Sequence, residues 1–212
     1  HQCLNESMWR DVLDLAAASR ARLILGLSMN TGHDAYSTDP FPFPWNPANA
    51  RKLLSWTIDA GLDHLLFGLE LGNEQNNKYS PQQIATNFAR LQRLTEELWP
   101  SEHTRPRLLG PDPHGLHAAL PDNATKAKLS WLGQWLGNAT SLGVPIFGVT
   151  HHEYIEVEPT PKGFSNASKL DTTGELARAV NATVRSVAST KGVALFAGEI
   201  GPHNGGSPPC NH

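Results

Sequence analysis

The stretch LFGLELGNE, at residues 66–74, decides how the rest of the sequence is interpreted. Its apolar residues make a run of strand length, which ends in Gly72 and is followed by an amide and a carboxylate, Asn73 and Glu74. A buried strand explains the leucines but not the tip, because charged side chains are seldom left at a core boundary without a partner. The stretch therefore predicts a strand that presents a functional pair at its carboxyl end.

The same arrangement recurs along the chain, where short apolar runs alternate with amphipathic helical patterns at a spacing of roughly 40 residues. Strands are predicted at 22–27, 66–71, 107–110, 145–149 and 193–197, and helices at 6–18, 47–60, 81–98, 129–142 and 172–191. Alternation of this kind is typical of βα units around a parallel sheet, which is an α/β fold. No linker or repeat interrupts the pattern, so residues 1–212 are predicted to form a single domain.

Two helix starts carry the pattern of a capping box, in which a Ser or Thr side chain and a Gln or Glu three residues later bind each other's backbone amides. One is Ser80 with Gln83, and the other is Thr172 with Glu175. Both pairs precede apolar residues at helical spacing, so each is predicted to begin a helix.

Composition excludes two classes of partner. The 17 basic and 20 acidic residues give a net charge of -3, which offers no basic surface for a phosphate backbone, so nucleic acid is not an expected partner. No apolar run approaches the ~18 residues of a membrane span. Since the chain opens at His1 without a charged-then-apolar leader, processing or truncation is expected to have removed what came before.

Cysteines and glycosylation signals bear on the compartment. The two cysteines, Cys3 and Cys210, could pair with each other or with partners outside this stretch. Five Asn-X-Ser/Thr signals favour passage through the secretory route, and hence a secreted or lysosomal glycoprotein, over coincidence. They begin at Asn5, Asn123, Asn138, Asn166 and Asn181.

The candidate site lies at the strand ends. Carboxyl ends of parallel strands in a βα architecture share one side of the molecule, which is where active sites are built. Polar residues predicted on that side are Asn30, Asn73, Glu74, Asp112, His151, His152, Glu153, Tyr154 and Glu199. Two carboxylates that face each other, here Glu74 and Glu199, could divide the work of cleaving a glycosidic bond. The competing interpretation pairs both glutamates with local Lys or Arg at an exposed surface.

Metal and nucleotide sites are weaker interpretations. His114 with His117, and His151-His152-Glu153, bring possible ligands close in sequence, but adjacent strand residues point to opposite faces. One of His151 and His152 is therefore expected to be a hydrogen-bonded core histidine, and no metal is expected. A nucleotide-binding fold should carry a glycine-rich phosphate turn after an early strand, which this sequence lacks. No other cofactor is expected either.

The segment LELGNE, at residues 69–74, resembles the strand-four signature of the heparanase and heparanase-like endo-β-glucuronidases, glycoside hydrolase family 79. Segments 25–30, 110–112, 150–152 and 198–199 are similar to the family in the same order. The resemblance implies that Glu74 is the acid/base and Glu199 the nucleophile of a retaining enzyme. It further implies that substrate is bound, or the nucleophile oriented, by Asn73, Asn30, Asp112, His151, His152, Tyr154 and His203.

The resemblance also implies a fold and a substrate. The fold is a partial TIM (β/α)8 barrel of about five βα units, strands 3 to 7, without the first two strands, the last strand or any β-sandwich. The expected activity is that of a retaining β-glycosidase on uronic-acid-containing glycans, such as heparan sulfate or plant-type proteoglycans. Only Lys78 and Lys162 are basic candidates near the mouth. The alternatives are a catalytically inactive barrel fragment or carbohydrate-binding remnant, and another retaining β-glycosidase of the same clan.

Overall fold

The computed structural model describes residues 4–29, 43–117, 123–154, 165, 167–187 and 192–201. In chain order the elements are α1 (Glu6–Ala18), β1 (Leu23–Leu27), α2 (Ala48–Asp59), the 3-10 helix η1 (Asp63–Leu65), β2 (Leu66–Leu71), the 3-10 helix η2 (Gln75–Asn77), α3 (Pro81–Leu98), β3 (Arg107–Pro111), β4 (Leu116–His117), α4 (Asn123–Ser141), β5 (Ile146–Tyr154), α6 (Ala167–Leu170), α7 (Thr172–Ser186) and β6 (Ala194–Gly201). None of the helices in these ranges combines the length and the apolar character that a bilayer crossing requires.

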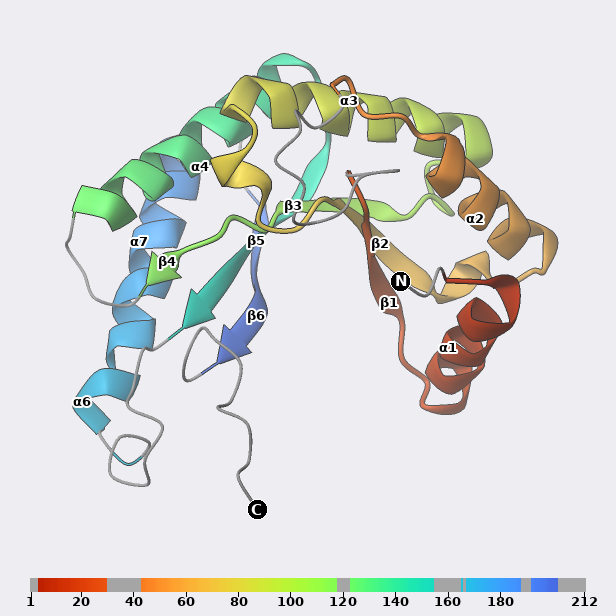
Figure 1. The fold of residues 1–212 in the computed structure, drawn as a ribbon, viewed down its shortest axis with the longest axis horizontal. Helices are drawn as coiled ribbons and strands as arrows, with labels where there is room; N and C mark the ends of the chain where they lie inside the picture. The colour runs from red at the N-terminus through yellow and green to blue at the C-terminus, as the bar shows by residue number, and fades with distance from the viewer. Residues whose placement is uncertain are drawn as a thin grey trace.

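Five parallel strands form a curled sheet, and each lies beside the strand that precedes it in the chain. The order is β1, β2, β3, β5 and β6, while the two-residue β4 continues the line of β3 and pairs with the end of β5. The larger helices cover the outer side of the curve, and the inner side faces the opening of a half-barrel (Figure 1). The sequence prediction of a partial (β/α) barrel is confirmed, and the described residues contain no β-sandwich.

All five predicted strands are present, but two of them are longer than the apolar pattern indicated. β5 continues through the polar segment to Tyr154, and β6 continues past Glu199 to Gly201. The reason is pairing: β5 has β3 and β4 on one edge and β6 on the other, so its backbone groups stay satisfied beyond the apolar residues. Polar residues that the pattern placed after these strands therefore lie within them, with fixed register.

The two predicted capping boxes have different outcomes. At the start of α3, the Ser80 amide donates to Gln83 Oε1 at 2.9 Å and the Gln83 amide donates to Ser80 Oγ at 3.2 Å, so that capping box is confirmed. The prediction of a capping box at Thr172 is wrong. Helix α6 runs directly into α7, so Asp171 already has helical backbone angles and no side chain caps the start of α7.

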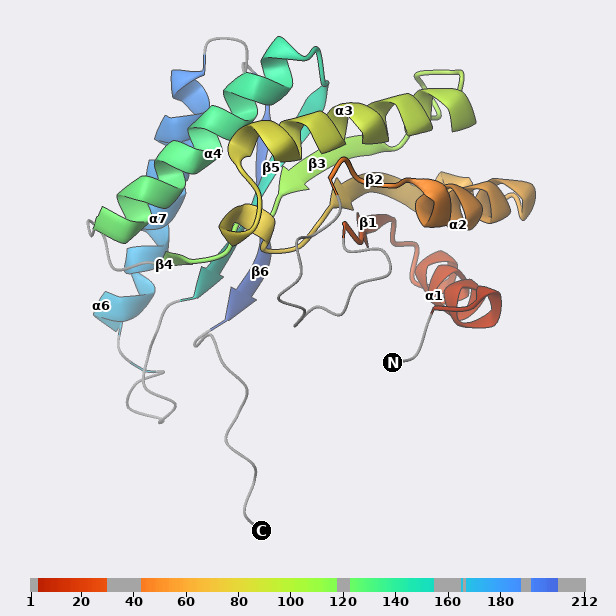
Figure 2. The same cartoon turned by 45° about the horizontal axis from the view of Figure 1, so that its top comes forward.

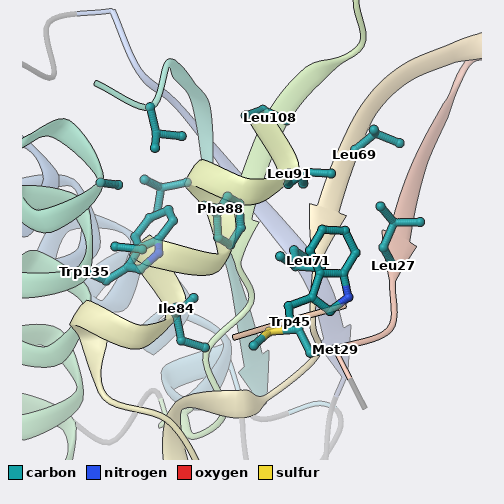
Figure 3. Close-up of a cluster of buried hydrophobic side chains, with 14 of the residues drawn as sticks. Leu27, Met29, Trp45, Leu69, Leu71, Ile84, Phe88, Leu91, Leu108 and Trp135 are labelled. Carbon is teal, nitrogen blue, oxygen red and sulfur yellow. The ribbon is translucent and has the colours of Figure 1, made fainter. Parts of the chain in front are cut away.

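The main hydrophobic core lies between the sheet and α3. Leu27 from β1 and Leu69 and Leu71 from β2 face Phe88 and Leu91 of α3 (Figure 3). Phe88 also packs edge-on against Trp135 of α4, with ring centroids 5.3 Å apart. This layer joins α3 and α4 to β1 and β2, and it thereby fixes where the carboxyl ends of those strands lie. Figure 2 shows α3 and α4 lying across the outer side of β2, β3 and β5.

The amino ends of the strands have a different character. Pairing shifts register once between β1 and β2, so that Phe67 is skipped, and once between β3 and β5, so that Phe147 is skipped. The two rings meet edge-on with centroids 5.6 Å apart. The guanidinium of Arg107 lies 4.8 Å from the ring of Phe67 and 4.4 Å from that of Phe147, which is cation–π geometry. An aromatic and cationic stack therefore occupies this end, and the carboxylate pair lies at the other.

Replacing Leu91 by Ala tests the core layer, with the same substitution at Leu15 as a control. Leu91 is completely buried, so we expect Leu91→Ala to lower the free energy of unfolding by about 2 to 5 kcal/mol. Leu15 is 69% exposed, and Leu15→Ala should change it by no more than about 0.5 kcal/mol. Urea denaturation followed by circular dichroism measures both. Equal effects of the two substitutions would contradict the assignment of this layer as the core.

Candidate active site

Two strained backbone positions define the mouth of the half-barrel. Glu74 follows β2 and Asp112 follows β3, and both have positive φ angles, of 52° and 49°. The Glu74 amide donates to the Asp112 carbonyl at 3.0 Å, which joins the two turns. Among non-glycine residues of the described ranges only Arg20 shares such a φ. Strain of this kind costs about 1 to 3 kcal/mol per residue and is concentrated at functional sites, so these two turns mark a candidate site.

Gly72 makes the turn before Glu74 possible. Its φ is +87°, and a Cβ there would lie 2.8 Å from the sulfur of Met29 and 3.0 Å from Cγ of Gln75. Gln75 is buried, and its side-chain amide donates to the carbonyl of Asn73. A larger residue at 72 would displace this packing. The Gly-Asn-Glu sequence is thus explained as a tight turn that sets the direction of the Glu74 side chain.

His114 reaches the site from the loop after β3. Its backbone amide donates to Asn76 Oδ1 at 2.7 Å, and its carbonyl accepts from Asn76 Nδ2 at 3.1 Å. This reciprocal pair ties the loop after β3 to the loop after β2. It brings His114 Nδ1 to 3.2 Å from Glu74 Oε1.

His152 of β5 lies at the centre of the site, and its side chain is only 2% exposed. Its Nδ1 is 2.9 Å from Glu74 Oε1 and 3.5 Å from Glu199 Oε2. Its Nε2 is 3.6 Å from Asp112 Oδ1. Tyr154, two residues further on the same face of β5, donates its hydroxyl to Glu199 Oε1. One imidazole therefore contacts carboxylates from three different strand ends.

Glu74 and Glu199 face each other across His152. Since both carboxylates have an oxygen within 3.5 Å of one nitrogen atom, those oxygens can be no more than about 7 Å apart. This bound is compatible with the separation of about 5 to 5.5 Å between the carboxyl groups of retaining glycosidases. Glu74 and Glu199 remain open to solvent, with side-chain exposures of 31% and 51%, so a substrate can reach both.

The electrostatics of Glu74 and His152 are linked. Burial lowers the pKa of His152, but its interactions with the carboxylates of Asp112 and Glu74 outweigh this effect and raise that pKa to about 9. Burial likewise raises the pKa of Glu74, but the hydrogen bonds from His152 and His114 outweigh it, and the pKa lies below its ordinary value of 4.5. At neutral pH the pair is an imidazolium bonded to a carboxylate.

A pair of carboxyl groups, Glu70 and Asp112, lies next to Glu74 and His152. Burial, followed by the nearby charge of Asp112, raises the pKa of Glu70 to about 8. Burial also raises the pKa of Asp112, but its polar interactions with His152 and Glu70 outweigh it, and the pKa lies below the ordinary value of 3.8. Glu70 and Asp112 line a cavity of about 330 Å³ together with Asn73. The cavity adjoins the Glu74 turn and does not include Glu199.

Most of the residues expected at the site are found together. Glu74, Asp112, His152, Tyr154 and Glu199 form one contacting cluster. Asn73 is exposed and lines the neighbouring cavity.

His151 lies apart from this cluster. His151 points away from His152, is 4% exposed, and its Nε2 lies 3.8 Å from Glu153 Oε2 on the other face of β5. His151 does not contact the carboxylate pair, as the alternation of strand faces requires. Asn30 and His203 lie outside the described residues.

Sequence reasoning missed Glu70 and assigned His114 only to a possible metal site. The signal for Glu70 was a charged residue inside an apolar strand. Because side chains alternate along a strand, Glu70 points to the face opposite Leu69 and Leu71, which is the inner face. His114 gave no local signal, because only the pairing with Asn76 brings it to Glu74. Within the described ranges no group of three His, Cys, Asp or Glu residues is arranged to hold a metal ion.

A curled sheet of parallel strands covered by helices on its outer side defines a domain of the (β/α)-barrel class. The family model of the glycosyl hydrolase family 79 N-terminal domain matches residues 1–155. The chain belongs to glycosyl hydrolase family 79. No curated protein matches the sequence.

A solved structure supports the fold. The glucosidase from Croceicoccus marinus, determined at 1.8 Å resolution, is 12% identical to this chain and superposes with a TM-score of 0.58. The superposition covers 98% of this chain and 40% of the glucosidase, so the chain spans less than half the length of that enzyme.

The linked pKa values predict how stability depends on pH. Glu70 and His152 have pKa values raised above their ordinary 4.5 and 6.5. Their contributions to the free energy of unfolding are therefore lost as pH rises through about 8 and about 9. Glu74 and Asp112 have lowered pKa values, so theirs are lost as pH falls below 4.5 and 3.8. We expect the melting temperature to be highest between pH 4.5 and 6.5. Scanning calorimetry across pH 3 to 10 tests this, and a maximum above pH 8 would contradict it.

Proposed function

We propose that this chain carries the catalytic pair of a retaining β-glycoside hydrolase. The observation that supports the proposal most directly is that Glu74 and Glu199, from strands far apart in the sequence, both contact the one imidazole of His152. Two glutamates that were only surface residues would not be expected to share a contact with one buried histidine. Membership of family 79 supports the same reaction class.

Glu199 is the proposed nucleophile. The Tyr154 hydroxyl donates to one of its oxygens, and His152 approaches the other at 3.5 Å, so the carboxylate is held in one orientation. In the first step Glu199 attacks the anomeric carbon and the bond to the leaving oxygen breaks, which leaves a glycosyl-enzyme ester. In the second step water attacks that carbon, the ester bond breaks, and the sugar is released with its original anomeric configuration.

Glu74 is the proposed acid/base. As a carboxylic acid it gives its proton to the leaving oxygen in the first step, and as a carboxylate it takes one from the attacking water in the second. The neighbouring His152 and His114 lower its pKa, so its acid form requires acidic conditions. Because the acid must be protonated, activity should fall as pH rises from the acid side.

Two glycan classes are candidates for the substrate. The resemblance of residues 69–74 to heparanase-like enzymes favours a uronic acid in the cleaved unit. A neutral glucoside is the second candidate, because the superposed structure is named a glucosidase and because the residues that line the 330 Å³ cavity include no Lys or Arg to bind a uronate. Lys78 follows η2 on the exposed side of the turn, and Lys162 lies outside the described residues.

A non-catalytic role is the main alternative. A half-barrel leaves β1 and β6 as sheet edges within the described chain, and a site that lacks the opposite wall could bind sugars without cleaving them. Turnover separates this alternative from the proposal, since binding alone requires no acid/base.

Glu74→Gln, Glu199→Gln and the control Glu97→Gln test the catalytic assignment. We expect Glu74→Gln to lower kcat by about a hundredfold to ten-thousandfold, because the proton donor is lost. Glu199→Gln should abolish formation of the glycosyl-enzyme ester, and Glu97, exposed on α3 and paired with Arg51, should tolerate the change. Aryl β-glucuronides and aryl β-glucosides serve as substrates, and proton NMR identifies the anomer first released.

The outcomes of this experiment separate the candidates. Preference for the glucuronide supports the uronic-acid specificity, and preference for the glucoside supports the second candidate. Release of the inverted anomer contradicts the double displacement. Sugar binding without turnover, and unaffected by Glu74→Gln, identifies a binding remnant.

We also propose that the protein passes through the secretory route to the cell exterior or a lysosome. The glycosylation signals at Asn123 and Asn181 begin on exposed side chains of α4 and α7, whereas Asn138 is half-buried within α4. Expression in a eukaryotic secretory host should yield glycopeptides at Asn123 and Asn181 and none at Asn138, as measured by mass spectrometry after glycosidase treatment. A fully unglycosylated product would contradict the proposal.

A further inference from the structure

Glu70 and Asp112 form a carboxyl pair that the proposed reaction leaves without a task. Glu70 lies on β2 and Asp112 immediately after the neighbouring β3, and their carboxyl groups lie within hydrogen-bonding reach of each other. Both line the cavity beneath the Glu74 turn. They are therefore next to the catalytic pair and separate from it.

The hydrogen bonding of this pair is incomplete unless it holds a proton. Glu70 Oε1 and Asp112 Oδ1 are shielded from solvent, and neither accepts a hydrogen bond from an amide or hydroxyl group. The Thr150 hydroxyl is in contact with both carboxyls but has one hydrogen to donate. Two ionised carboxylates in contact would also repel each other. One proton placed between them removes the repulsion and gives the shielded oxygens a hydrogen bond.

We propose that Glu70 and Asp112 share one proton and act as a single unit of charge -1, which holds the His152 imidazole in place beneath the two catalytic carboxylates. Glu70 is the neutral member and donates to Asp112. Asp112 is the charged member and faces His152 Nε2 at 3.6 Å. Glu70 and Asp112 are thus positioning residues, since they act through His152 and do not contact the reacting atoms.

The groups that face this unit are consistent with that charge distribution. From β5 come the Thr150 hydroxyl, which accepts from the Asp112 amide at 3.2 Å, and His152. From β6 comes Glu199, which meets His152 on its Nδ1 side together with Glu74 from the turn after β2. With Asp112 charged, His152 has a carboxylate at each nitrogen, which favours its cationic form. With the Glu70 pKa raised to about 8, the shared proton stays on the pair at physiological pH.

Gly198 allows Asp112 its position. A Cβ at residue 198 would lie 2.8 Å from Asp112 Oδ1, and the β5–β6 register shifts at this point, so that His151 pairs with Ala197 and His152 with Glu199. Because glycine has no side chain, Gly198 leaves room for the Asp112 carboxyl.

Nuclear magnetic resonance titration of the whole chain tests the inference without any need for turnover. Carbon-13 shifts of the Glu70 and Asp112 carboxyl groups, and nitrogen-15 shifts of His152, are followed from pH 3 to pH 10. The variants are Glu70→Gln, which imitates the protonated acid, Asp112→Asn, which removes the charge, and Glu97→Gln, which is the matched exposed control. Circular dichroism and thermal melts establish that each variant is folded.

The expected result is a wild-type pair with one protonated and one ionised carboxyl at pH 6. In Glu70→Gln, His152 should still titrate within one pH unit of about 9, because the charge of Asp112 is retained. In Asp112→Asn, the His152 midpoint should fall toward its ordinary value of 6.5. The loss of melting temperature between pH 5 and pH 8.5 should be smaller in Glu70→Gln than in the wild type or Glu97→Gln.

Two fully ionised carboxyls at pH 6 in the wild type would overturn the inference, and so would a His152 midpoint in Glu70→Gln that falls as far as in Asp112→Asn. Should Asp112→Asn fail to fold, the wild-type carboxyl shifts and the Glu70→Gln titration still decide the question. The role of the pair in catalysis rests on the proposed glycosidase function. Absence of turnover would contradict that function and leave the titration results standing.

Discussion

The site depends on one buried cation. His152 has almost no exposed surface, and burial of a charge is unfavourable unless partners surround it. Here the partners are carboxylates from the ends of β2, β3 and β6, which contact both nitrogens of the ring. The three strand ends must therefore converge on β5, and the acidic residues that would otherwise repel one another are held together by the charge between them.

The hydrophobic layer on the other side of the sheet makes that convergence possible. α3 packs Phe88 and Leu91 against β1 and β2, while α4 extends the layer toward β5, so the strand order and tilt are fixed by apolar contacts outside the half-barrel. The inner face is then free to carry Glu70, Asp112 and His152. Separation of a packing face from a chemical face follows from the period-two alternation of side chains along each strand.

The protonation states of the site follow from where each group lies. Of two glutamates four residues apart, Glu70 is shielded and next to Asp112, so it retains a proton, whereas Glu74 accepts from two histidines and ionises readily. Identical side chains thus take opposite forms at neutral pH. Protonation of Glu74 therefore requires acidic conditions, whereas Glu70 holds its proton up to about pH 8.

The sequence by itself determined the five main strands, the larger helices and the two glutamates, because apolar periodicity and a polar tip after an apolar run are local signals. It did not determine where β5 and β6 end, because their extension depends on pairing between strands. It also identified Asp112, His152 and Tyr154 as strand-end residues. Only the tertiary structure decided which histidine faces the site, since neighbouring strand residues have similar local patterns and opposite directions. It alone brought in His114 and Glu70, whose roles depend on Asn76 and Asp112 from other loops. Contacts between residues distant in sequence, and the burial that shifts their protonation, have no local signature in a chain.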